Sequence, residues 1–66
     1  MSRLEILRAM WERSADESRH FQVAIEHLYA GGLHSLALVL EEILADTHGF
    51  QGWIEAEISK TEAERK

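Results

Sequence analysis

The sequence predicts an all-α protein, an antiparallel hairpin of two long helices that dimerises into a four-helix bundle. Apolar residues recur every three or four positions along nearly the whole chain, as they do on one face of an α-helix. The 66 residues include no proline, so the commonest helix breaker is missing. The adjacent glycines Gly31-Gly32 divide the pattern into two halves of similar length, which predicts one domain with a single turn.

The first helix is predicted over about residues 3–29. Its apolar seam alternates spacings of three and four residues, a heptad pattern with two serines in the middle. Glycine just past the last periodic residue ends a helix, because glycine adopts the left-handed conformation without a steric penalty. The turn is therefore expected at residues 30–32. The seam comprises Leu4, Leu7, Trp11, Ser14, Ser18, Phe21, Ile25 and Leu28.

The second helix is predicted over about residues 33–61. Its pattern passes through Gly49 and Gly52 without losing phase, although an interior glycine costs about 1 kcal/mol relative to alanine. We therefore expect one continuous helix, softened near residues 49–52. Residues 62–66 have no apolar anchor and are expected to fray. The seam comprises Leu33, Leu36, Leu40, Ile43, Thr47, Phe50, Ile54, Ile58 and Thr61.

A single hairpin is expected to leave part of this apolar surface exposed. A chain of 66 residues buries only about 60% of its unfolded surface, and without cysteine it has no disulfide to compensate. Met10, Ala24, Val39 and Trp53 widen the stripe beyond a two-helix seam. The sequence therefore predicts a homodimer. Its dimer and core residues are Leu4, Leu7, Trp11, Phe21, Ile25, Leu28, Leu36, Leu40, Ile43, Phe50, Trp53 and Ile54.

Charge and hydropathy exclude two classes of partner. The net charge is −5, and the four arginines of the first helix scatter around it instead of forming the basic stripe that binds phosphates. No apolar run approaches the roughly 20 residues of a membrane span, and the charged N-terminus is unlike a signal peptide. We expect a cytoplasmic protein that binds itself or an unidentified protein partner, but neither nucleic acid nor a membrane.

Histidines and carboxylates raise the alternative of a metal site. Glu17 and His20 form an E-x-x-H pair, whose spacing places both side chains on one helix face, as in carboxylate-bridged metal bundles. Glu17 lies at the edge of the predicted seam and His20 outside it, while Glu41 and His48 lie on the flank of the second helix. Metal ligands must converge inside the bundle. These four residues are more simply explained as solvated or boundary side chains.

The polar residues that do point into the predicted seam are Ser14, Ser18 and Thr47. In an antiparallel hairpin that closes at residues 30–32, Ser14 faces Thr47. Each hydroxyl can bond the carbonyl one turn back on its own helix, so this layer needs no ligand. Its small side chains also leave room for the neighbouring aromatic rings.

The second helix resembles the last long helix of bacterioferritins. The pattern Glu42-Ile43-Leu44-x-Asp46-x-x-Gly49-x-x-x-Trp53-x-Glu55-x-Glu57 is similar to the family's E-I-L-x-D-E-E-x-H-x-D-W-L-E. Upstream, Glu5-Ile6-Leu7-Arg8 is similar to the E-M-L-R that begins the family's third helix. The resemblance spans about residues 5–58 and corresponds to the C-terminal half of a bacterioferritin subunit. It implies a ferritin-like four-helix bundle.

The resemblance also implies that an ancestral di-iron site has been lost. The family's ligands, a glutamate on the third helix and an E-x-x-H on the fourth, fall on Ser14, Thr47 and Phe50. A hydroxyl is a poor iron ligand and a phenyl ring is none. We expect a non-enzymatic interaction or regulatory module with no catalytic residues and no cofactor. The alternative is an iron- or zinc-binding protein, with ferroxidase activity, whose site was rebuilt from Glu17, His20, Glu41 and His48.

Overall fold

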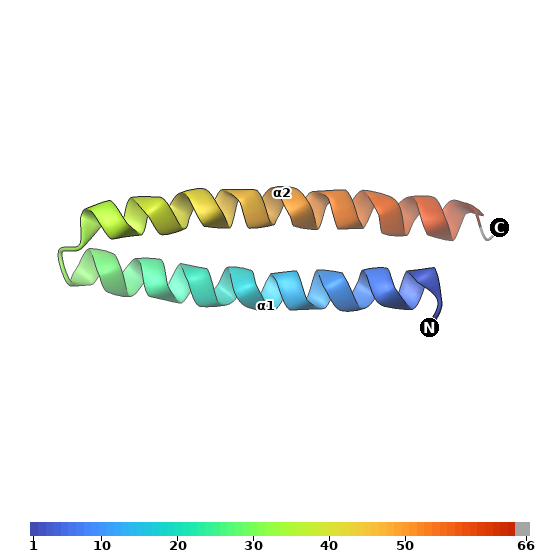
Figure 1. The fold of residues 1–66 in the computed structure, drawn as a ribbon, viewed down its shortest axis with the longest axis horizontal. Coiled ribbons are helices and arrows are strands. Elements are labelled where there is room, and N and C mark those ends of the chain that lie inside the picture. The colour runs from blue at the N-terminus through green and yellow to red at the C-terminus, as the bar shows by residue number, and fades with distance from the viewer. Residues whose placement is uncertain (65–66) are drawn as a thin grey trace.

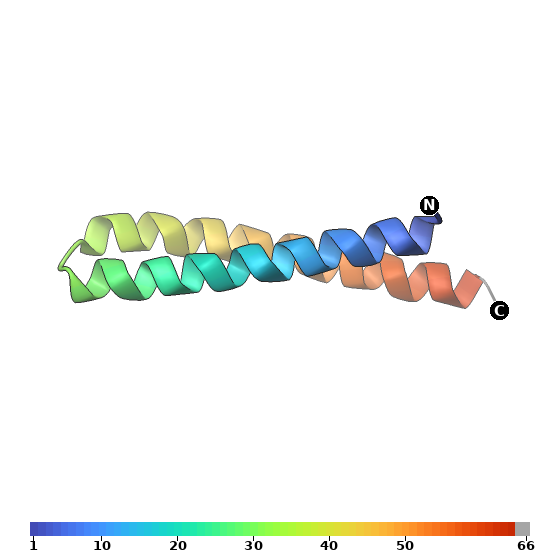
Figure 2. The same ribbon diagram turned by 90° about the horizontal axis from the view of Figure 1, so that it is seen from below.

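Two long helices make up the structure, a computed structural model that describes residues 1–64 (Figure 1). Helix α1 spans Arg3–Ala30 and helix α2 spans His34–Glu64. The helices run antiparallel and side by side, and the molecule measures 52 × 17 × 12 Å (Figure 1). A view turned by 90° shows that the two helices cross at a shallow angle, as helices packed along heptad seams do (Figure 2). The predicted all-α antiparallel hairpin is confirmed, whereas its pairing with a second copy stays a prediction.

Both ends of α1 satisfy its free backbone groups. Ser2 caps the first turn, where its Oγ accepts a hydrogen bond of 3.1 Å from the Glu5 N–H. At the other end Gly32 has a φ of +79°, and its N–H donates to the Tyr29 carbonyl. The Leu33 N–H donates to the Leu28 carbonyl at 2.8 Å, which completes a Schellman motif. Ala30 is still helical, so the turn lies at residues 31–33, one residue later than predicted.

Helix α2 is longer than the sequence predicts. It continues without a break through Gly49 and Gly52, and a Cβ added to either glycine would meet nothing within 4 Å. The prediction of a frayed tail is wrong for residues 62–64, which are helical; residues 65–66 lie outside the described part of the chain. Thr61 is buried, and the Glu62 carboxylate lies 3.9 Å from the Arg8 guanidinium, so this turn packs against α1 mainly through Thr61. Within residues 1–64, neither helix contains a segment apolar and long enough to cross a membrane.

The α1 side of the interface lies where the heptad pattern places it. Every residue of the predicted seam is either buried or half-buried, including the two serines. The buried positions are Leu4, Leu7, Ser14, Ser18 and Ile25.

Leu33, the first residue of the predicted second seam, lies in the turn and is 52% exposed. On α2 itself the predicted seam is wrong at three positions. Leu36, Ile43 and Phe50 are 55%, 41% and 46% exposed. The residues that follow each of them face α1 instead: Ala37, Leu44 and Gln51. The predicted set (residues 36, 43 and 50) and the observed set (residues 37, 44 and 51) are each spaced seven residues apart. The two sets are offset by one residue, which is about 100° around the helix.

The small side chain of Ala37 gives a physical reason for this rotation. Ala37 is fully buried at the start of α2, where the turn brings the two helices together. A methyl group lets their backbones approach more closely than a leucine would. The same rotation leaves Trp53, also predicted for the core, 54% exposed, whereas Ile54 is completely buried.

Candidate interaction surface

One side of the seam is closed by polar contacts between the helices. Trp11 Nε1 donates a hydrogen bond of 2.9 Å to Glu55, and Tyr29 Oη donates one of 2.7 Å to Glu41. The hydrogen bond to Glu41 raises the pKa of the Tyr29 phenol above its ordinary value, and desolvation and the negative charge of Glu41 act in the same direction. We call this side the polar flank. Its carboxylates include Glu41, Glu55 and Glu62.

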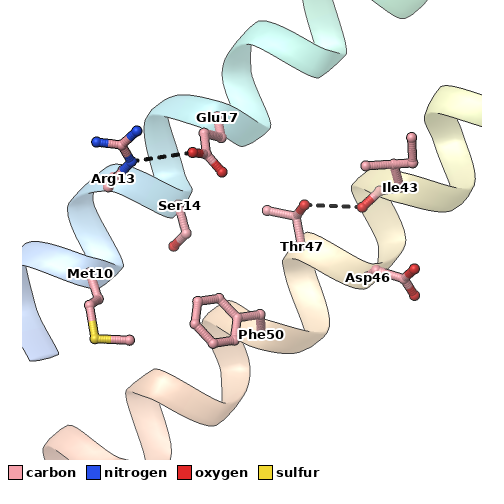
Figure 3. A pocket seen from close by; sticks show the side chains of 8 residues that line it. All are labelled: Met10, Arg13, Ser14, Glu17, Ile43, Asp46, Thr47 and Phe50. Atoms are coloured by element: carbon pink, nitrogen blue, oxygen red, sulfur yellow. Dashed lines mark hydrogen bonds and ion pairs between the residues drawn. The ribbon is translucent and has the colours of Figure 1, made fainter.

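The other side of the seam is an open groove with mainly apolar walls. It consists of two adjoining hollows that share Glu17. Glu17 pairs with Arg13 at 3.4 Å, and both side chains are largely exposed (Figure 3). The hollow nearer the chain termini is lined by Met10, Arg13, Ser14, Glu17, Ile43, Asp46, Thr47 and Phe50. The hollow nearer the turn is lined by Glu17, His20, Phe21, Ala24 and Leu40.

Ser14, Thr47 and Phe50, the positions at which the sequence resemblance places lost di-iron ligands, lie together in the first hollow. Ser14 approaches from α1, and Thr47 and Phe50 approach from α2 (Figure 3). Ser14 Oγ donates to the Trp11 carbonyl at 2.8 Å, and Thr47 Oγ1 donates to the Ile43 carbonyl at 3.0 Å. Both hydroxyl protons are therefore used inside their own helices, as the sequence predicts.

Ser18 behaves differently from the other two hydroxyl residues. Its Oγ donates to Gln51 Oε1 across the seam, at 3.1 Å, and this bond joins the middles of the two helices. Sequence reasoning missed Gln51 because it assigned the neighbouring Phe50 to the seam. Ser18 could have pointed to Gln51, because a buried hydroxyl on one helix favours a hydrogen bond with a polar side chain that faces it from the other helix. Among residues 1–64, every buried side-chain nitrogen or oxygen has a hydrogen-bond partner.

The four candidate metal ligands are divided between the two sides of the hairpin. Glu17 and His20 line the groove. Glu41 accepts the Tyr29 hydrogen bond on the polar flank, and His48 lies one heptad further along that side of α2. In the part of the chain that the structure describes, no three histidine or carboxylate side chains are arranged to hold a metal ion. One copy of the protein therefore does not bring the four residues into one site.

Comparison with known proteins gives no relative, since no family model, curated protein or solved structure matches this chain. Function is therefore inferred from the chemistry of the groove and of the polar flank.

The hydroxyls in the groove are expected to be dispensable. We predict that Ser14→Ala and Thr47→Val leave the midpoint of thermal unfolding unchanged or raise it. Each hydroxyl proton serves only a carbonyl of its own helix, so its loss costs about 1 kcal/mol or less, and each change adds apolar character at the seam. Circular dichroism melts measure the effect. Ser18→Ala is the control, because it removes a bond between the helices and is expected to destabilise by about 1 kcal/mol. Unfolding by Ser14→Ala alone would mean that the hydroxyl layer itself is required.

Proposed function

We propose that this protein is a non-enzymatic homodimer, a ferritin-like four-helix bundle that acts as a small interaction or regulatory module. The observation that carries the proposal is that a single copy leaves many large apolar side chains exposed, among them Leu36, Phe50 and Trp53, and has a large total surface for its mass. The accessible surface of the hairpin is 4922 Å² for a mass of 7.6 kDa. A compact monomer of this mass exposes about 4,300 Å², so the hairpin exposes about 600 Å² more than expected.

The small core of one copy supports the same proposal. Within residues 1–64 only five hydrophobic residues are buried, and Ile54 is the one large side chain among them that is completely buried. A chain of this size without a disulfide or a metal is commonly stabilised by oligomerisation. A second hairpin would cover apolar side chains that the first leaves half exposed.

The resemblance to bacterioferritins supports the four-helix architecture and the loss of metal chemistry. In that family four helices surround the di-iron site, and two copies of this hairpin would supply four. The corresponding ligand positions carry Ser14, Thr47 and Phe50, which line one hollow here. These three side chains offer iron no charged ligand, and the two carboxylates of the same hollow, Glu17 and Asp46, are not among the positions that the resemblance assigns to metal ligands.

Sedimentation equilibrium at micromolar concentration tests the proposal. We expect a mass of twice the 7.6 kDa of one chain. The monomer mass throughout this range would contradict the homodimer. Elemental analysis of the same samples is expected to find no stoichiometric iron, manganese or zinc. One or more metal ions per dimer, lost on changing His20 to alanine, would favour the metal-binding alternative.

A further inference from the structure

We infer that the second copy docks on the groove, so that the two grooves face each other and the polar flank of each copy stays on the surface. This inference rests on the proposed homodimer and adds which face of the hairpin forms the interface. Three observations carry it: the apolar side chains along the groove, the charges on the two sides of the hairpin, and the area of the exposed apolar stripe.

Exposed apolar side chains form a stripe along the groove side of α2. Ile43 and Phe50 line the first hollow, and Leu36 lies one heptad earlier on the same face. The Trp53 ring is stacked with that of Phe50, with their centroids 6.1 Å apart, so the two rings form one aromatic platform. Val39 lies between Leu36 and Ile43 along this face and is 53% exposed. We call these five residues the α2 stripe.

The area of the α2 stripe fits a second copy. Its side chains are between 41% and 55% exposed. Half-exposed side chains of this size present on the order of 100 Å² each, or about 500 Å² for the stripe. Met10, Phe21 and Ala24 add apolar area from α1. The total approaches the roughly 800 Å² per partner that a stable protein interface buries.

The charges of the two flanks favour contact through the groove. Around the groove, Arg13 pairs with Glu17, and Asp46 adds one further carboxylate. On the polar flank, one heptad series of α2 carries Glu41, His48, Glu55 and Glu62, and within residues 1–64 only Glu62 of its three carboxylates lies within 4 Å of an arginine, Arg8. A two-fold contact through that flank would bring the carboxylates of one copy against those of the other, in a chain with a net charge of −5. Repulsion between like charges opposes that arrangement.

Two leucines of α2 provide a matched test of the face. Leu36 belongs to the α2 stripe and is 55% exposed, whereas Leu38 is 56% exposed and lies two positions further along. Two positions correspond to about 200° around the helix, so Leu38 points away from the groove. Glutamate at either position replaces the same residue at the same exposure. Within the hairpin, glutamate at position 38 also lies one helical turn from Glu41 and Glu42, a like-charge contact that costs about 0.2–0.5 kcal/mol. Apart from this small cost, the two variants should differ in their effect on the interface.

Sedimentation equilibrium of the two variants is the experiment. We expect Leu36→Glu to raise the dimer dissociation constant at least about 30-fold, because a carboxylate would be buried in the interface without a partner. Leu38→Glu is expected to dimerise as the natural chain does. Loss of the dimer in Leu38→Glu, with Leu36→Glu unaffected, would overturn the groove as the interface and leave the homodimer standing. If the natural chain were monomeric at every concentration, both the homodimer and the groove interface would be wrong.

Thiol reactivity gives a second readout if Leu36→Glu unfolds. The natural chain has no cysteine, so a single cysteine at position 36 or 38 reports on its own environment. We expect the thiol of Leu36→Cys to be protected from a disulfide reagent at dimer concentrations and to react on dilution. The thiol of Leu38→Cys should react equally fast at both concentrations. Protection at position 38 alone, or equal reactivity at both positions in a dimeric sample, would overturn the inference.

Discussion

Ile54→Ala is expected to lower the free energy of unfolding by about 2–5 kcal/mol, which approaches the whole stability of a domain of this size. Ile54 is the only large side chain with no exposed surface within residues 1–64. Truncation removes its contacts with α1 and leaves a cavity in the middle of a thin, two-helix interface. Urea denaturation followed by circular dichroism measures the loss.

Two further variants separate the cavity from a general loss of apolar surface. Ile54→Val removes one methylene group and is expected to cost about 0.5–1.5 kcal/mol. Ile6→Ala changes an isoleucine that is 45% exposed and should cost less than Ile54→Ala does. If Ile6→Ala were the more destabilising of the two alanine variants, Ile54 would not be the centre of the core.

Ala37→Leu is expected to destabilise the protein by about 1–3 kcal/mol, because added methyl groups at a fully enclosed position force the helices apart. Ala37 has no exposed surface, and it takes the seam position that the sequence assigns to Leu36. Thermal unfolding compares this variant with Ala45→Leu, which places the same side chain at an exposed position of α2 and should change stability by less than about 0.5 kcal/mol. If Ala37→Leu were as stable as the natural chain, Ala37 would not face α1 closely, and the prediction that Leu36 faces α1 would be favoured.

The hairpin itself could be predicted because each of its determinants is local. The three-and-four spacing gives two helices, the pair Gly31-Gly32 gives the turn, and Gly49 and Gly52 leave the phase of the pattern unchanged. The own-helix hydrogen bonds of Ser14 and Thr47 were predictable for the same reason, since their acceptors lie one turn away. Each of these features depends on neighbours in the chain.

The rotation of α2 could not be predicted because it depends on the other helix. The set that faces α1 (residues 37, 44 and 51) includes Ala37 and Gln51, whereas the neighbouring set (residues 36, 43 and 50) is entirely apolar. From the sequence alone the neighbouring set is therefore the more hydrophobic of the two. The close approach at Ala37 and the bond from Ser18 to Gln51 select this series only when α1 is in place. That residues 62–64 are helical could not be predicted for a similar reason. Glu62 lies near Arg8 of α1, a residue far away in the sequence.

Nuclear magnetic resonance on a mixture of 13C-labelled and unlabelled chains would test the groove interface most directly, since filtered spectra detect only contacts between copies. We predict intermolecular Overhauser effects at the methyl groups of Leu36, Val39 and Ile43. Val23 and Leu38 are 53% and 56% exposed on other faces of the hairpin, and their methyl groups should show none. Contacts at Val23 and Leu38 without contacts at these three residues of the α2 stripe would contradict a dimer built through the groove.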